Sequence, residues 1–363
     1  MNPIRFIVLF CITLSLLEAK IIEHNRINPI IIEIFQTFRS IYTPEEEESF
    51  ASLNPYDITK ATTILNKLAQ KYFLRPAHLS RLQPPELTEY YIKTLFKDVA
   101  KDQIDTIRKK IYALFEKAGY IDPVYPTCRT PQNILILGAT MMVIWKRIAF
   151  LNELVRTGKI ILSETTTITL CIGHRIIENY EQEDLQKLHT DNNHTITEPF
   201  INEIEGGKSL IEIFPFCNDI RRESIYIAIG QAQEGKKTAT TGDNINTWLA
   251  MPHHQDGTTL IISGNPYVEY QTEAIRLCFA KHDHCPNLFS LIEGAGFGSH
   301  LTQETFTIKD TGVYLDNIAR TLYTLTKIYE VVPPSNTWIP KLMHDLMQLF
   351  YISIKKIRKL LHI

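Results

Sequence analysis

The feature that most constrains the fold is a series of short apolar segments in the second half of the chain. They are rich in β-branched residues, and stretches with helical spacing separate them. Because parallel strands covered by helices on both faces read as near-continuous apolar runs, this alternation predicts a doubly wound α/β domain with a mainly parallel sheet. The predicted strands are ILIL (134–137), ITLCI (168–172), IYIAI (225–229), TTLIIS (258–263) and LFSLI (288–292).

The chain has room for one large domain and accessory segments, because its 363 residues exceed the length of one typical domain. We assign residues 131–335 to the α/β domain and residues 20–130 to a helical N-terminal region. Two patterns support the helical region. Thr43 precedes Pro44 and a run of glutamates, which is typical of a helix start, and a later helical run ends at Gly119.

The first residues resemble an export signal. Arg5 precedes an apolar run from Phe6 to Leu17, which is shorter than the roughly 20 residues that a membrane span requires. Ala19 offers a small residue before a cleavage site. We therefore expect residues 1–19 to be a signal peptide and the protein to be exported to the periplasm or cell envelope. An uncleaved N-terminal anchor and a buried first helix are the alternatives.

The C-terminal segment, residues 336–363, is predicted to contain an amphipathic helix over 338–363. An apolar stripe runs beside Lys355, Lys356 and Arg358. The spacing favours packing against the N-terminal helices, and contact of this helix with an anionic membrane surface is the alternative.

Composition and charge narrow the range of partners. The apolar fraction of 44% and the charged fraction of 21% are typical of globular proteins, and the net charge of −2 gives no support for a nucleic-acid partner. Five cysteines remain after the predicted signal, too few and too scattered for a disulfide framework. Cys171 lies in a predicted strand and is expected in the core.

Two local motifs in the last third of the domain are assigned structural roles. CFAKHDHCP contains Cys278, His282, His284 and Cys285, but its spacing matches no common zinc module, so no metal is expected. EGAGFGSH (293–300) has the glycines of a phosphate loop without its lysine, so we interpret it as a flexible loop.

Small and polar residues follow three of the predicted strands. In an open parallel sheet these positions meet at the carboxyl edge, where backbone N–H groups and helix N-termini favour an anionic ligand. Ordinary strand-to-helix turns are the alternative interpretation for each one. The residues are Gly138, Ala139 and Thr140; Gly173, His174 and Arg175; and Ser263, Gly264 and Asn265.

Two predicted helix starts face the same edge. The segment from Thr240 to Thr247 is rich in threonine, aspartate and asparagine, which suits helix capping as well as ligand contact. After the fourth strand, Pro266 is expected in a first helical turn, followed by Tyr270 and Gln271.

These segments together resemble the family of YdcF, SanA and ElyC, Rossmann-like proteins linked to bacterial envelopes. The resemblance covers roughly residues 131–300. It rests on ILILGATMMVIWKRIAFLNELVRTGKI, LCIGHRIIENYE, TEPFINE, TATTGDNINTWL and LIISGNPYVEYQTEAIRL. The family pattern includes an arginine on the first helix, an isolated glutamate that opens a helix and a Thr/Asn-rich segment. Its polar pocket would correspond to Gly138, Arg147, Gly173, Glu198, Thr241, Asn244 and Ser263.

The chain departs from the family pattern at the implied pocket. His174 follows Gly173 where the family has paired glycines, and NPYVEYQ replaces a histidine and arginine after the fourth strand. The resemblance also implies S-adenosylmethionine as a ligand.

The expected function is binding of a small anionic or nucleotide-like molecule at the carboxyl edge. Arg147 is expected to reach back toward this edge and pair with Glu178 or Glu198. The sequence assigns no catalytic residue. An envelope scaffold with a degenerate pocket is the rival, and a cofactor-dependent transferase would require a general base. The predicted ligand-binding residues are Gly138, Ala139, Thr140, Arg147, Gly173, Arg175, Glu198, Thr241, Asn244, Ser263, Asn265 and Gln271.

Overall fold

The computed structural model describes most of the chain between residues 21 and 332. The predicted signal peptide (1–19) and the predicted helix over 338–363 lie outside the described residues, as do His282, His284 and Cys285. The described ranges are 21–23, 26–76, 84–196, 198–232, 234, 238–281 and 291–332.

A five-stranded, all-parallel sheet forms the centre of the α/β domain. The order β5-β4-β3-β6-β7 confirms the predicted doubly wound, Rossmann-like class. The first strand is central, with Ile134 opposite Ile168 on one side and Leu260 on the other. The strand order therefore reverses between β3 and β6. The strands are β3 (Asn133–Leu137), β4 (Thr167–Gly173), β5 (Ile225–Gly230), β6 (Thr259–Gly264) and β7 (Ile292–Phe297).

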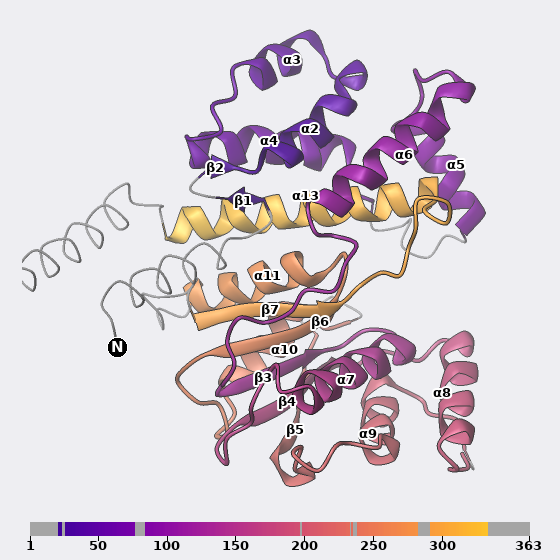
Figure 1. Cartoon of the computed structure of the whole chain (residues 1–363), viewed down its shortest axis with the longest axis vertical. Coiled ribbons are helices and arrows are strands. Elements are labelled where there is room, and N and C mark those ends of the chain that lie inside the picture. The colour runs from indigo at the N-terminus through magenta and orange to yellow at the C-terminus, as the bar shows by residue number, and fades with distance from the viewer. Residues whose placement is uncertain are drawn as a thin grey trace, which may run out of the picture.

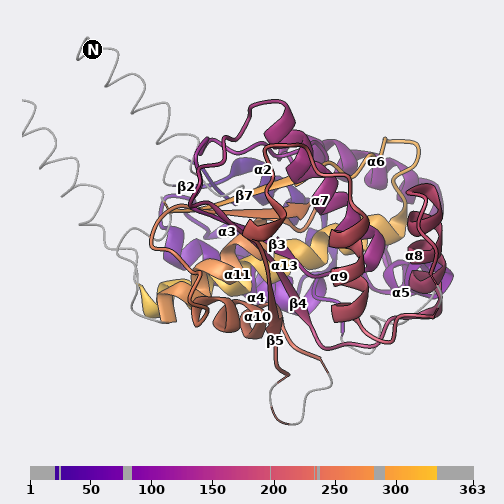
Figure 2. The same ribbon diagram turned by 90° about the horizontal axis from the view of Figure 1, so that it is seen from below.

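Helices cover both faces of the sheet, which explains why the strands are apolar throughout. Successive residues of a strand point to opposite faces. Ile134 and Ile136 pack with one group of helices, whereas Leu135 and Leu137 join the core on the other face, together with Cys171, as expected. In Figure 2 the strands lie between these two groups. The first group is α7 (Met141–Arg156), α8 (Asn179–Asp191) and α9 (Glu203–Ile213); the second is α10 (Thr241–Leu249) and α11 (Val268–Lys281).

The fifth strand differs from the sequence prediction. EGAGFGSH was expected to be a flexible loop, but its first five residues belong to β7, Ile292–Phe297. The cause is close packing of α11 on the strand backbone. A Cβ at Gly296 would lie 2.5 Å from Val268 Cγ2, and one at Gly294 would overlap Thr272 Oγ1. Glycine here permits close approach of a helix, and it removed the apolar signal that identifies a strand.

The N-terminal region is helical, as predicted. Thr43 and Glu46 form a capping box at the start of α3, and Gly119, with φ of +75°, follows the end of α6. The elements are β1 (Ile22–Glu23), β2 (Arg26–Ile27), α2 (Pro29–Thr37), η1 (Arg39–Ile41), α3 (Pro44–Ala51), α4 (Ile58–Tyr72), α5 (Pro84–Thr94) and α6 (Lys101–Lys117), and η3 (Arg222–Ser224) precedes β5.

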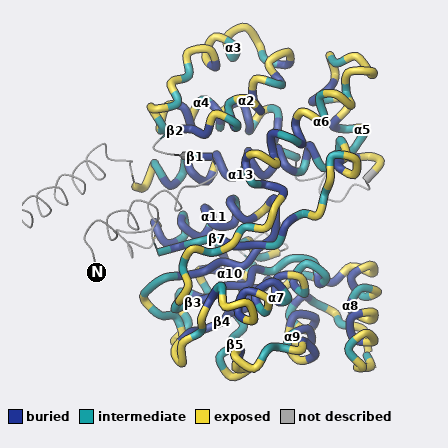
Figure 3. The backbone as a smooth tube through the Cα atoms, viewed as in Figure 1, coloured by how far each residue is buried: buried dark blue, intermediate teal, exposed yellow. Residues whose placement is uncertain are grey.

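One long helix, α13 (Ile308–Val331), connects the two parts of the molecule. Figure 1 shows it between α11 and the N-terminal helices, and Figure 3 shows how much of it is buried. Leu315, Ile318 and Leu322 share one hydrophobic core with residues of the N-terminal region such as Phe35 and Phe115. Within the described ranges, no helix has the length and apolarity needed to cross a membrane.

Packing between α13 and α5 generates a stability prediction. A Cβ at Gly312 would overlap the ring of Tyr91. Although replacing a helical glycine by alanine ordinarily stabilises by about 1 kcal/mol, we expect Gly312→Ala to destabilise the protein by about 1–3 kcal/mol in urea unfolding. Gly242→Ala in α10 is the matched control, since its nearest neighbour would be Cys278 Sγ at 3.6 Å. Equal loss of stability in both variants would contradict the packing argument.

Candidate functional site

Glu203 lies where the ends of β3 and β4 meet. It is the first residue of α9, because the Asn202 side chain caps that helix by accepting from the amides of Ile204 and Glu205. The Glu203 residue is only 4% exposed. A Cβ at Gly138 would lie 2.6 Å from Glu203 Oε1. Gly138 is therefore the residue that makes room for this carboxylate at the strand ends.

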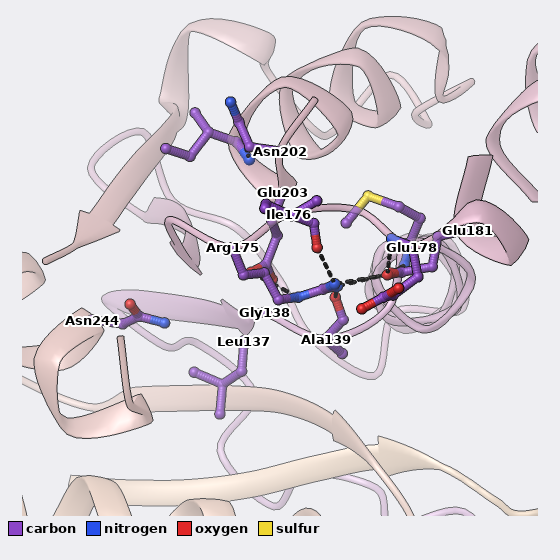
Figure 4. Close-up of polar contacts among 12 residues, drawn as sticks. Leu137, Gly138, Ala139, Arg175, Ile176, Glu178, Glu181, Asn202, Glu203 and Asn244 are labelled. Carbon is purple, nitrogen blue, oxygen red and sulfur yellow. Dashed lines mark hydrogen bonds and ion pairs between the residues drawn. The ribbon is translucent and has the colours of Figure 1, made fainter. Parts of the chain in front are cut away.

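Arg175 links Glu203 to a second buried carboxylate. Its Nη1 and Nη2 donate to the two oxygens of Glu181 at 2.7 and 2.8 Å, and its Nε lies 3.3 Å from Glu203 Oε2. Nη2 also donates to the carbonyl of Ala139 at 2.7 Å. Figure 4 shows the guanidinium directed toward Glu181 and Ala139. Arg175 thus forms ion pairs with both Glu181 and Glu203 near the end of β4.

Side chains of the protein itself accept from amides at the starts of two helices at this edge. Glu181 Oε1 accepts from the amide of Met141, the first residue of α7, at 3.1 Å. Thr240 and Asp243 form a capping box at the start of α10. The sequence interpretation assumed that these amides were free for an anionic ligand. The structure instead places acceptor groups at the edge.

The two carboxylates have different proton affinities. Burial raises the pKa of Glu203 to about 7, although Arg175 and the backbone amides of Gly173 and Ala139 act in the opposite direction. Burial also acts to raise the pKa of Glu181, but its hydrogen bonds and charge interaction with Arg175 outweigh burial and lower it. Glu181 is thus ionised at neutral pH, whereas Glu203 can gain or lose a proton there.

Asn244 extends the edge to β5. A Cβ at Gly230 would overlap the Asn244 side-chain oxygen, so α10 packs directly on the end of that strand. Asn244 Nδ2 lies 3.5 Å from the carbonyl of Cys171. Its Oδ1 is buried and has no hydrogen-bond partner among the described residues. This oxygen is a further acceptor at the edge.

Arg147 does not pair with Glu178 or Glu198, and that prediction was wrong. Both glutamates are exposed, whereas Arg147 is buried. Among the described residues, its hydrogen-bond acceptors are the carbonyls of Leu137 and Gly138, Gln271 Oε1 and Ser263 Oγ. Burial lowers the Arg147 pKa to about 10, so the guanidinium keeps its charge at neutral pH.

The predicted site residues separate into three groups. Gly138, Ala139, Gly173 and Arg175 lie around Glu203, Thr140 follows them at the start of α7, and Asn244 lies beside them at β5. Arg147, Ser263 and Gln271 form a buried polar cluster between the ends of β3 and β6. The remaining three, Asn265, Thr241 and Glu198, lie elsewhere.

Each of the remaining three has a different environment. Asn265 Nδ2 donates to the carbonyls of Gly119 and Asp122, so it fixes the connection from the helical region. Pro266 precedes α11 and is not part of its first turn. Thr241 borders a cavity on the other side of α10. Glu198 is exposed in the loop before α9.

The sequence interpretation chose the wrong glutamate in TEPFINE. Glu203, not Glu198, opens the helix. Pro199 was an available signal, because a residue before proline is biased away from helical conformation, and Asn202 is a favourable cap. Glu181 had no such signal, since it lies within a predicted helix with several other acids.

Known proteins give no assignment for this site. No family model matches the chain, and no curated protein or solved structure matches it. The resemblance to the YdcF, SanA and ElyC family stays a prediction. Across the described residues, there is no group of three or more histidine, cysteine, aspartate or glutamate side chains that could hold a metal ion.

The raised pKa of Glu203 predicts a pH dependence of stability. The pKa is about 7 in the folded protein instead of the ordinary 4.5, so the folded state binds this proton more tightly than the unfolded state does. The stability that results is fully present below pH 4.5 and is lost as the pH rises through 7. The unfolding free energy of the wild type, relative to Glu203→Gln, should fall by up to about 3 kcal/mol between pH 4 and pH 8. Urea unfolding across this range measures it.

Glu198→Gln is the control for this series. It removes an exposed carboxyl and keeps Glu203, so the unfolding free energy of this variant should depend on pH as that of the wild type does. A difference between Glu203→Gln and the wild type that stays constant from pH 4 to 8 would show that Glu203 ionises normally.

Proposed function

We propose that the edge formed by the ends of β3, β4 and β5 binds a small molecule through hydroxyl or amino groups that donate to Glu203. The observation that carries this proposal is the position of Glu203. Its carboxylate is buried at the strand ends, in the space that the missing side chain of Gly138 leaves for it. In open α/β sheets, the carboxyl ends of the strands are where ligands bind.

The acceptors at this edge determine which part of the ligand would face it. Glu181 and Asp243 already accept from the amides at the starts of α7 and α10. Glu203 also accepts from the amides of Gly173 and Ala139 and contacts Arg175, but it lacks the bidentate pairing of Glu181. The Asn244 oxygen has no hydrogen-bond partner among the described residues. These two groups are the ones to which we propose that a ligand donates. The hydroxyls of a ribose or sugar ring suit these acceptors, and so does the ammonium group of S-adenosylmethionine. A nucleotide-like ligand thus fits through its sugar, with its anionic part directed away from Glu203.

A ligand screen tests this proposal. Purified protein is heated with nucleotides, sugar nucleotides and S-adenosylmethionine, and a ligand at 100 times its dissociation constant should stabilise by about 2.7 kcal/mol. Glu203→Gln should weaken binding of that ligand by about 10- to 100-fold, because a bond to an ionised acceptor is lost. Glu198→Gln should bind as the wild type does.

The outcome also separates the rival function. A protein that none of these compounds stabilises would fit an envelope scaffold with a degenerate pocket. A ligand that binds equally well to the wild type and Glu203→Gln would contradict the proposed position of the site.

We further propose that the protein acts after export, in the periplasm or envelope. The support is the apolar N-terminal run with Ala19 at its end and the resemblance of the α/β domain to an envelope-linked family. Mass spectrometry of protein from fractionated cells should find a mature chain that begins at Lys20. A chain that retains Met1 would favour an N-terminal anchor, and recovery in the cytoplasmic fraction would contradict export.

A further inference from the structure

A cavity of about 540 Å³ lies on the other side of the first turn of α10 from the Glu203 edge. Four helices form its walls: α4, α10, α11 and α13. It lies between the helices of the α/β domain and those that pack on the N-terminal region. Its volume is within the range of roughly 300–1,000 Å³ that is usual for small-molecule sites.

Two cations from different helices border this cavity. Arg320 of α13 donates through Nε to Asp316 at 2.9 Å, and its guanidinium lies 6.0 Å from the centre of the Tyr270 ring. Lys281 is exposed at the end of α11. Asp316 pairs with both Arg320 and Arg75, and Asp243, held in the capping box of α10, is the acid that lines the cavity. The three cations Arg75, Arg320 and Lys281 therefore outnumber these two acids by one.

The start of α10 adds donors on the opposite wall. The capping box there uses the amides of Thr240 and Asp243. The amides of Thr241 and Gly242 belong to the same first turn, border the cavity, and have no acceptor among the described residues. The positive end of the helix dipole therefore faces the same space as the two cations.

The remaining walls combine apolar and aromatic side chains with the polar residues Gln70, Asn246 and Thr324. The apolar and aromatic lining residues are Leu74, which follows α4, Ala274 and Leu277 of α11, and the rings of Tyr270 and Tyr323. A flat apolar group can lie against these side chains while a charged group faces the cations. Mainly apolar walls with a few charged groups are typical of sites for small organic molecules.

We propose that this cavity is a second binding site, for a small organic phosphate or carboxylate with an aromatic or other flat apolar part. The anionic group lies near Lys281, Arg320 and the first turn of α10, and the apolar part lies against Tyr270 and Leu277. This ligand class differs from that of the Glu203 edge, where a ligand donates hydrogen bonds to acceptors. The two sites are therefore separable by mutation.

Phenyl phosphate is the probe for this site, with benzyl alcohol as its neutral counterpart. Calorimetry on the full chain should show that phenyl phosphate binds the wild type and that benzyl alcohol binds at least about tenfold more weakly. Lys281→Gln should raise the dissociation constant of phenyl phosphate by about tenfold or more. Lys327→Gln is the matched control, because Lys327 is on α13 but pairs with Glu330 outside the cavity.

A second variant tests the cavity itself. Ala274→Phe places a ring in the space, so it should abolish phenyl phosphate binding without removing a charge. Lys281→Gln changes only an exposed side chain, so its effect on binding stands even if Ala274→Phe impairs folding.

Alkylation of cysteine locates the bound probe. Cys278 borders the cavity and Cys217 does not, although both are partly exposed. Phenyl phosphate should slow iodoacetamide labelling of Cys278, measured by peptide mass spectrometry, and leave Cys217 unchanged.

Several outcomes would overturn the second site. These are absence of binding to the wild type, equal binding by Lys281→Gln, equal binding by benzyl alcohol, and equal protection of both cysteines. Loss of phenyl phosphate binding in Glu203→Gln would place the anion at the Glu203 edge instead. Binding that survives in Glu203→Gln and fails in Lys281→Gln supports the site.

Discussion

The buried guanidinium of Arg147 determines how the α/β domain uses its carboxyl edge. The strand order reverses between β3 and β6, and this is the point where doubly wound sheets usually leave a crevice for a ligand. In this protein the guanidinium of Arg147 occupies the position between the ends of β3 and β6. It donates to the carbonyls of Leu137 and Gly138, and to Gln271 beside Ser263. A charged group can remain there because four oxygens replace its hydration. The charged groups of the edge, Glu181, Glu203 and Arg175, lie away from this point, at the ends of β3 and β4.

The balance of charge among Arg175, Glu181 and Glu203 explains why Glu203 binds a proton near neutral pH. Two buried carboxylates, Glu181 and Glu203, compete for one arginine, Arg175. Glu181 takes the bidentate interaction and also accepts an amide of α7, so it holds its charge. Glu203 has the longer contact with Arg175, and this contact does not outweigh the effect of its burial. A proton compensates for the missing cation, which is why its pKa lies near neutrality.

The sequence predicts strands that are buried on both faces, but it does not predict contacts between residues that are far apart in the chain. Strands such as Ile134–Leu137 are apolar on both faces because helices cover both, so a run of aliphatic residues predicts them. In β7 the glycines that admit α11 removed that signal. The partners of Arg147 are 116 and 124 residues away in Ser263 and Gln271, and no local pattern predicts such a contact. Gly138 and Arg175 were correctly placed at the edge because both lie within two residues of the end of a strand. To place Glu203, the start of α9 had to be known within a few residues.

The shared core around α13 has a consequence for the order in which the chain can fold during synthesis. Residues such as Phe35 and Phe115 pack against Leu315 and Leu322, with residues 122–305 between the two contributions. At roughly 5–20 residues per second, a ribosome takes about 10–40 s to make that intervening segment. The N-terminal helices therefore leave the ribosome long before the helix that completes their core, and during that interval their apolar faces are available to chaperones.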